Sequence, residues 1–284
     1  MKKGITLMDG AVGTSLWAMA EERGIAKVPV WRYNVEHPEL IEQLTKEYID
    51  AGAEILLANT FGANGPMVRR SSSYDPAEVI ASGVRAAKNA LRGSGRKLAL
   101  SIGPLSTMLE PFGDTTEEEA AEIFRVMLDA GMKEGPDLIL VQTFIDLAMM
   151  EVAAREAMRY GVPVFCCMTF EKKGRTMFGN SVEDVIETLE PLGISGIGLN
   201  CSLGPDLAVP VMREFVGKTS LPLVFKPNAG KPILAPDGTT STAFSVDEFV
   251  ADIAPALEFV DYIGGCCGSD PSYIRALKAR IDAG

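Results

Sequence analysis

Leu-Ile-Leu-Val-Gln-Thr (residues 138–143) is an apolar run that ends in two polar residues. Parallel strands covered by helices on both faces have this composition, because neither face meets water. More short apolar runs recur along the chain, and almost all of them also end in polar residues or glycine. The eight predicted strands are Ile5–Asp9, Glu54–Asn59, Lys97–Ile102, Leu138–Thr143, Val162–Met168, Gly196–Asn200, Leu221–Lys226 and Asp261–Gly265.

The segments between these runs carry the start signals of helices. Pro38 opens one such segment, residues 38–51, whose apolar residues recur at helical spacing. Further helix caps and capping boxes are indicated at Thr115-Thr116 before three glutamates, at Ser181-Val-Glu-Asp, at Ser245-Val-Asp-Glu and at Asp270-Pro271. Residues 63–75 are polar instead, and they predict a longer loop.

Eight strands that alternate with helices predict an α/β fold, the (β/α)8 or TIM barrel. A chain of 284 residues suits one such barrel, so we expect a single domain over residues 1–284. A doubly wound sheet is the alternative. The first strand disfavours it, because no glycine-rich phosphate-binding loop follows that strand.

Charge and hydropathy exclude several classes of partner. The net charge of −11 argues against nucleic acids and anionic membrane surfaces as partners, because both require clustered Lys and Arg. No apolar stretch approaches the 18 or so residues that a membrane-spanning helix needs. The first residues are basic but lack the apolar run of a secretory signal, so we expect a cytoplasmic protein.

In a barrel, the polar ends of all strands meet on one rim, where barrel enzymes bind their substrates. Residues at these ends are therefore candidates for substrate contact. They are Asp9, Gly10, Gly13 and Thr14 after the first strand, Asn59, Thr60 and Phe61 after the second, Gln142 in the fourth, Asn200 in the sixth and Asn228 after the seventh.

The five cysteines are an odd number, and four of them form two adjacent pairs, which is a poor disulfide framework. Cys201, Cys266 and Cys267 follow the sixth and eighth strands. Three thiolates with one open position suit a catalytic zinc, although a structural zinc or an inert thiol cluster remains an alternative. Neighbouring residues of a regular strand point to opposite faces. The glycines that flank residues 266–267 permit the turn that a shared metal requires.

The second pair, Cys166-Cys167, lies within a strand that has no glycine. One side chain should therefore point into the barrel and the other outward, with both acting as small apolar core residues. His37 is the only histidine and precedes Pro38 at a helix start, where we expect it on the surface. A single histidine almost excludes His-dependent catalytic triads and HExxH zinc sites.

Six of these strand-end motifs resemble those of the homocysteine S-methyltransferases, most closely the homocysteine-binding module of cobalamin-dependent methionine synthase. The resemblance runs in consistent order from residue 5 to about residue 275. The motifs are Asp-Gly-Ala-Val-Gly-Thr (9–14), Ala-Asn-Thr-Phe-Gly-Ala-Asn (58–64), Met-Thr-Phe-Glu-Lys-Lys-Gly-Arg-Thr (168–176), Leu-Asn-Cys-Ser-Leu-Gly-Pro (199–205), Lys-Pro-Asn-Ala-Gly-Lys-Pro (226–232) and Gly-Gly-Cys-Cys-Gly (264–268).

The resemblance implies a zinc-dependent methyltransferase that converts homocysteine to methionine. It implies a Zn²⁺ cofactor held by Cys201, Cys266 and Cys267, with the thiol of the substrate in the fourth position. The methyl donor implied by the module is a separate methyl-corrinoid or folate protein. A donor of this kind and a small-molecule thiol are thus the expected partners.

Two residues depart from the family pattern. Gln142 stands where the family usually has a glutamate that holds the substrate ammonium, and Lys226 stands where the module is often acidic. We therefore expect a more positive substrate end, and a methyltransferase for a different thiol is one alternative. Others are a non-catalytic zinc-binding or thiol-binding barrel subunit, and a lyase or aldolase that forms a Schiff base through Lys226.

Overall fold

The computed structural model describes the chain except residues 1, 3, 231–232, 235–239 and 242–243. Eight strands form one sheet in the order β1-β10-β7-β6-β5-β4-β3-β2, and all neighbours are parallel. These strands are β1 (Thr6–Leu7), β2 (Ile55–Leu57), β3 (Lys97–Ile102), β4 (Leu138–Phe144), β5 (Val164–Met168), β6 (Gly196–Asn200), β7 (Leu223–Lys226) and β10 (Tyr262–Ile263).

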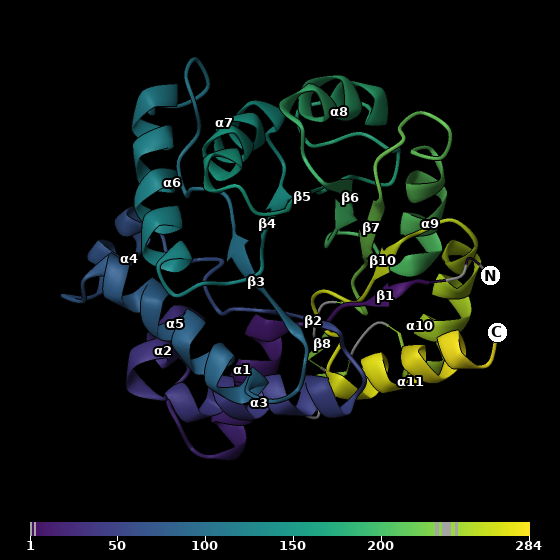
Figure 1. Ribbon diagram of the computed structural model, residues 1–284, viewed down its shortest axis with the longest axis horizontal. Helices are drawn as coiled ribbons and strands as arrows, with labels where there is room; N and C mark the ends of the chain where they lie inside the picture. The colour runs from purple at the N-terminus through teal and green to yellow at the C-terminus, as the bar shows by residue number, and fades with distance from the viewer. Residues whose placement is uncertain (1, 3, 231–232, 235–239, 242–243) are drawn as a thin grey trace.

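The two outer strands of this sheet, β1 and β2, meet and close it. The Glu54 N–H donates to the Leu7 carbonyl at 2.7 Å, and the Asp9 N–H donates to the Ile55 carbonyl at 3.0 Å. Helices surround the closed sheet (Figure 1). The predicted (β/α)8 barrel is therefore confirmed, and the doubly wound sheet is excluded.

Eleven α-helices are described. They are α1 (Val12–Glu22), α2 (Tyr33–Glu36), α3 (Pro38–Asp50), α4 (Gly65–Ser71), α5 (Pro76–Leu91), α6 (Glu117–Met132), α7 (Leu147–Ala157), α8 (Val182–Leu189), α9 (Pro205–Arg213), α10 (Val246–Ile253) and α11 (Pro271–Asp282). Four short 3₁₀ helices (Val30–Arg32, Met158–Tyr160, Glu190–Leu192 and Ala254–Glu258) and a hairpin of β8 (Ile233–Leu234) and β9 (Thr240–Ser241) complete the elements. No helix in the described part of the chain is both long enough and apolar enough to cross a membrane.

The predicted helix starts are present. Thr116, Ser181 and Ser245 each form a complete capping box with the acidic residue three positions later. Asp270 caps α11 through its side chain, and Pro38 occupies the first turn of α3. Because a cap satisfies backbone N–H groups that the helix leaves free, these short local patterns suffice to place the start of a helix.

The prediction of a loop over residues 63–75 was wrong, because this segment contains α4. The side chain of Asn64 accepts a hydrogen bond from the Met67 N–H at 3.0 Å, and Pro66 lies in the first turn. An asparagine cap followed by proline is a helix start. The polar composition of the segment, which suggested a loop, reflects that α4 exposes its last turn at Arg69 and Arg70.

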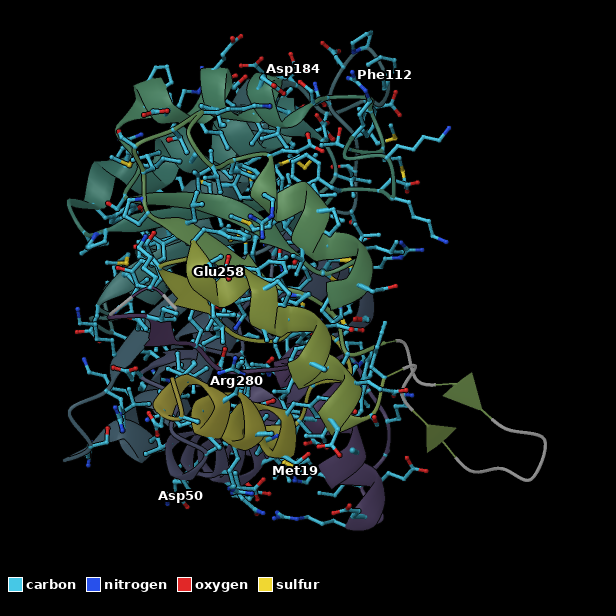
Figure 2. All side chains as sticks on the ribbon, turned by 90° about the vertical axis from the view of Figure 1, so that its right-hand side faces the viewer. Met19, Asp50, Phe112, Asp184, Glu258 and Arg280 are labelled. Carbon is cyan, nitrogen blue, oxygen red and sulfur yellow. The ribbon has the colours of Figure 1, made fainter. Side chains whose placement is uncertain are left out.

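Apolar residues form two layers of core, one inside the barrel and one between the strands and the helices. Figure 2 shows side chains filling the molecule, with exposed residues such as Asp50 and Asp184 at its edges. Cys167 belongs to the inner layer and Cys166 to the outer one, as predicted. Burial raises the pKa of both thiols, that of Cys167 to about 12, so both stay protonated and pack as apolar groups.

Gly198 in β6 is required by the close approach of β7. A Cβ atom added at this residue would lie 1.8 Å from the carbonyl oxygen of Val224, a backbone atom of the neighbouring strand. We therefore expect Gly198→Ala to lower the free energy of unfolding by about 1–3 kcal/mol, as overpacking does in other cores. Urea unfolding measures this change.

Gly62→Ala is the matched control for that substitution, because its new Cβ atom would lie 3.9 Å from Trp31 in ordinary contact. We expect the stability of this variant to stay within about 0.5 kcal/mol of the unaltered protein. Equal stability of the two variants would contradict the packing argument.

Candidate active site and metal centre

The three cysteines predicted as metal ligands converge at the carboxyl ends of the strands. Cys201 directly follows β6, and Cys266 and Cys267 follow β10 after two glycines. The three Sγ atoms lie within 4.8 Å of one another, and those of Cys201 and Cys267 are 3.8 Å apart. Among the residues that the structure describes, this is the one such group of His, Cys, Asp or Glu ligand atoms.

Local backbone geometry brings these thiols together. Cys201 and Ser202 have φ values of 61° and 60°, in the left-handed region that few non-glycine residues occupy. After β10, a Cβ atom on Gly265 would lie 2.1 Å from Ser269 Oγ, and Gly268 has a φ of 83°. Glycines thus permit the turn at residues 266–267, as predicted. The left-handed turn at Cys201 has no glycine to signal it in the sequence.

The donor set fits a zinc ion. Thiolates are soft ligands that select Zn²⁺ over Mg²⁺ or Ca²⁺. Tetrahedral zinc with Zn–S distances of about 2.3 Å holds its sulfurs about 3.8 Å apart. The separation of the Cys201 and Cys267 sulfurs is also 3.8 Å.

The three thiols lie close enough to shift one another's pKa. Hydrogen bonds from the thiols of Cys266 and Cys267 lower the pKa of Cys201 to about 3. The same contacts with the Cys201 thiolate raise the pKa of Cys267 to about 11 and that of Cys266 well above its usual value. Because only the deprotonated form of a cysteine binds a metal, binding of a divalent cation by these three residues would release protons.

Two asparagines that the sequence placed at this rim contact the thiols. The Asn200 Nδ2 lies 3.8 Å from the Cys266 Sγ. The Asn228 side chain hydrogen-bonds to Cys201, which contributes to the low pKa of that thiol. The Oδ1 atom of Asn228 is buried and has no hydrogen-bond partner among the described residues.

A cavity of about 270 Å³ opens beside the cysteines. Its wall contains six of the predicted substrate-contact residues, namely Gly10, Gly13, Thr14, Asn59, Phe61 and Gln142. It also contains Lys226, which was expected at the substrate end, and residues that were not predicted as substrate contacts, namely Ala11, Val12, Trp17, Val30, Leu57, Ala58, Ser101, Thr143 and Gly265. Ser101 had a signal, because it is the polar residue within the apolar run 97–102. Trp17 and Val30 come from segments after the first strand, and no local pattern marks them.

Four predicted contact residues lie outside the lining of this cavity: Asp9, Thr60, Asn200 and Asn228. Thr60 is buried, and its hydroxyl donates to the Ser101 carbonyl at 2.7 Å. Gly10 does line the cavity, but it also packs tightly, because a Cβ atom there would lie 2.2 Å from the Ser269 carbonyl oxygen. The roles of all these residues in binding a substrate stay predictions.

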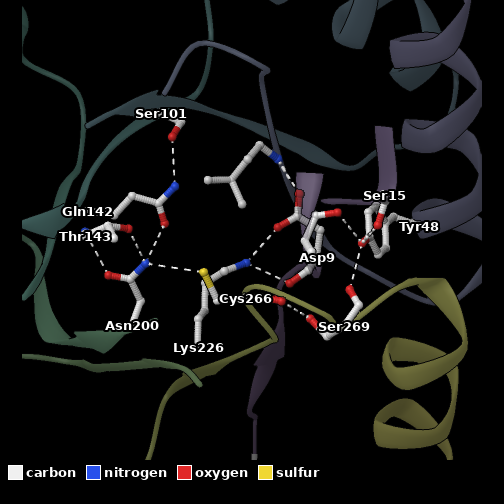
Figure 3. A network of polar contacts seen from close by, with 12 residues as sticks. Asp9, Ser15, Tyr48, Ser101, Gln142, Thr143, Asn200, Lys226, Cys266 and Ser269 are labelled. Atoms are coloured by element: carbon white, nitrogen blue, oxygen red, sulfur yellow. Dashed lines mark hydrogen bonds and ion pairs between the residues drawn. The ribbon is translucent and has the colours of Figure 1, made fainter. Parts of the chain in front are cut away.

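Asp9 forms a buried ion pair with Lys226, which itself lines the cavity (Figure 3). The Lys226 Nζ donates at 2.7 Å both to the Asp9 Oδ1 and to the Asp9 carbonyl, while the Asp9 Oδ2 accepts from the Leu57 N–H. Burial raises the pKa of Asp9, and the charge of Lys226 opposes that rise. The pair offsets much of the positive charge that the sequence led us to expect. It also disfavours a Schiff base, which requires a neutral amine.

Tyr48 anchors the segment that follows Cys267. Its hydroxyl lies 2.8 Å from the Ala11 carbonyl and 3.0 Å from the Ser269 carbonyl, and the Ser269 Oγ donates to the Cys266 carbonyl at 2.6 Å. Figure 3 shows this connection between α3 and the cysteine segment. The Tyr48 hydroxyl thus holds Ala11, which follows β1, close to Ser269, which follows the cysteines.

The family model for homocysteine S-methyltransferase matches residues 6–281. The chain belongs to the homocysteine S-methyltransferase family. The resemblance expected from the strand-end motifs is thereby confirmed, and so, at the level of the family, is the prediction of a methyltransferase enzyme.

Relatives within the homocysteine S-methyltransferase family match nearly the whole chain. The chain is 30% identical over 298 aligned residues to methionine synthase of Mycobacterium tuberculosis, which covers 96% of this chain and 24% of that protein. It thus spans about a quarter of the length of that relative. It is 27% identical to betaine–homocysteine S-methyltransferase 1 of Mus musculus, over 92% of this chain and 69% of that protein.

A solved structure shares the fold. The metallated form of the homocysteine methyltransferase MmuM from Escherichia coli has a TM-score of 0.80 and 25% identity, with 98% of this chain and 97% of that chain covered. The apo form of the same protein has a TM-score of 0.75. The shared barrel agrees with the closure between β1 and β2.

Proposed function

We propose that this protein is a zinc-dependent S-methyltransferase for a small thiol, with homocysteine as the reference acceptor and methionine as its product. Cys201, Cys266 and Cys267 would hold the Zn²⁺. One observation carries the proposal: three soft ligands converge within 4.8 Å at the wall of a cavity of about 270 Å³. Membership of the homocysteine S-methyltransferase family supports it.

The metal supplies one chemical property when bound, because it lowers the pKa of a thiol so that the nucleophilic thiolate predominates near neutral pH. The amide of Asn200 approaches the Cys266 sulfur, and that of Asn228 hydrogen-bonds to Cys201. Such contacts orient ligands and tune their basicity. Apolar residues of the wall, such as Trp17 and Val30, keep water from the reacting sulfur.

We further propose that residues 1–284 act as one barrel domain and accept the methyl group from a separate methyl-corrinoid or folate protein. The likeness to about a quarter of a methionine synthase supports this arrangement, because in that relative the matched region is combined with other parts of a longer chain. The proposed setting is the cytoplasm, where cysteine thiols stay reduced.

Zinc removal tests the proposed function. Dialysis against a chelator should lower the rate of homocysteine methylation, with methylcobalamin as a small-molecule donor, at least about tenfold, because the acceptor thiol then stays largely protonated. One equivalent of Zn²⁺ should restore the rate, and Mg²⁺, which prefers oxygen ligands, should not.

Two outcomes would contradict the proposal. A metal-free protein that keeps its full rate would exclude zinc from the reaction. A protein that binds zinc and thiol but transfers no methyl group from methylcobalamin, methyl-folate or S-methylmethionine would be the non-catalytic binding barrel that remained an alternative.

A further inference from the structure

The direction of every hydrogen bond between Asn200, Gln142 and Ser101 follows from one backbone group. The Thr143 N–H can only donate, and it lies 2.8 Å from the Asn200 Oδ1. The other end of that amide, the Nδ2, must therefore donate to its neighbours. These are the Gln142 Oε1 at 3.3 Å and the Thr143 Oγ1 at 2.7 Å (Figure 3).

The same logic continues to Ser101. Because the Gln142 Oε1 accepts from Asn200, the Gln142 Nε2 is the atom that faces Ser101, and it donates to the Ser101 Oγ at 2.8 Å. The hydroxyl oxygens of Ser101 and Thr143 are thus both acceptors in this network. Each hydroxyl keeps its proton for a further hydrogen bond. Both residues line the cavity, so the network presents two donors to a ligand.

A bulge in β4 makes this arrangement possible. Neighbouring residues of a regular strand point to opposite faces, yet Gln142 and Thr143 both line the cavity. The pairing of β4 with β5 shifts register between Gln142 and Phe144, and Thr143 has a φ of 65°. Bulges re-aim side chains in this way at binding sites.

The charged groups at the cavity favour the same kind of ligand. Lys226 lines the cavity, and two of its three N–H donors go to Asp9. The lining of this cavity includes no Asp or Glu among the described residues. Asp9 lies outside the lining, and both of its carboxylate oxygens accept hydrogen bonds from protein groups.

We infer that the preferred acceptor is a thiol with a carboxylate, or another anionic group, and without an ammonium group. This inference rests on the proposed function and specifies the substrate class of the same site. A carboxylate meets the hydroxyl donors of Ser101 and Thr143 and the remaining N–H donor of Lys226, whose charge Asp9 partly offsets. Among the described residues that line the cavity, the oxygens open to an ammonium group are all neutral, and burying a charge without a charged partner is costly.

Three thiols with the same three-carbon spacer between the sulfur and the charged group test the inference by isothermal titration calorimetry of the zinc-loaded protein. They are 4-mercaptobutanoate, which has only the carboxylate, homocysteine, which has both groups, and 3-aminopropane-1-thiol, which has only the ammonium. We expect 4-mercaptobutanoate to bind at least about tenfold more tightly than homocysteine, and the aminothiol to bind most weakly.

Binding of homocysteine as tightly as 4-mercaptobutanoate, or more tightly, would overturn this inference alone. Failure of all three to bind would overturn the proposed function and this inference with it.

Gln142→Glu is the variant that separates charge from shape. Its carboxylate retains both contacts, because one oxygen accepts from Asn200 and the other accepts from the Ser101 hydroxyl. We expect the ratio of the affinity for homocysteine to the affinity for 4-mercaptobutanoate to rise about tenfold or more in this variant. Gln142→Met is the matched control, because methionine has a volume similar to that of glutamate but no charge. In this variant the ratio of the two affinities should not shift toward homocysteine. An unchanged ratio of affinities in a folded Gln142→Glu protein would contradict the assignment of Gln142.

Discussion

Cys201→Ser is expected to lose its zinc and more than about 100-fold of its rate of thiol methylation. Cys201 contacts both of the other cysteines, and its sulfur is 3.8 Å from that of Cys267. Serine is a hard and weakly acidic ligand, so the site would keep two thiolates instead of three. Loss of groups that only orient metal ligands already costs about 10–100-fold, and loss of a ligand should cost more.

Metal analysis and the absorption of the cobalt-substituted protein measure the loss of the site directly. Cys166→Ala is the matched control, because Cys166 is buried in the outer core layer and lies outside the cluster. This control should keep one zinc per chain and most of its rate. Stoichiometric zinc and a full rate in Cys201→Ser would show that Cys201 is not a ligand.

Lys226→Met is expected to lower the free energy of unfolding at pH 7 by about 3–5 kcal/mol, the usual cost of removing one partner from a buried ion pair. Both side chains of the pair are 2% exposed. The substitution leaves the Asp9 carboxylate buried without its cation. Urea unfolding at pH 7 measures the change.

The pH dependence of this loss has a defined sign. Burial raises the pKa of Asp9, and removal of Lys226 removes a group that lowers it. A carboxyl group whose pKa is higher in the folded state makes the protein less stable as the pH rises through that pKa. The deficit of Lys226→Met should therefore be largest at neutral pH and should shrink as the pH falls and Asp9 takes up a proton.

The double variant Asp9→Asn/Lys226→Met provides the control for charge. It removes both members of the pair, so it should recover a large part of the stability lost in the single variant. A double variant as unstable as Lys226→Met would show that packing of the lysine stem, rather than charge, dominates the loss.

The sequence alone predicted the barrel, most helix starts and the three cysteines, because each depends on local patterns. Buried parallel strands are apolar runs, and caps are patterns of four residues such as Ser181-Val-Glu-Asp. The loop predicted over residues 63–75 shows the limit of this approach, because the segment is polar and yet Asn64 caps a helix within it.

Only the tertiary structure decided which polar groups pair. Asp9 and Lys226 are 217 positions apart, and Asn200 lies 58 positions from Gln142. No sequence pattern links partners at such distances, since closure of the barrel determines which strand ends meet. The cysteines could be interpreted from the sequence, because a cluster of thiolates supports few kinds of chemistry. An amide can both donate and accept hydrogen bonds, and only its neighbours decide which of its atoms does which. That is why the sequence indicated a metal centre and raised a different thiol as an alternative, while the hydrogen bonds around Gln142 show which groups of a thiol the site can pair.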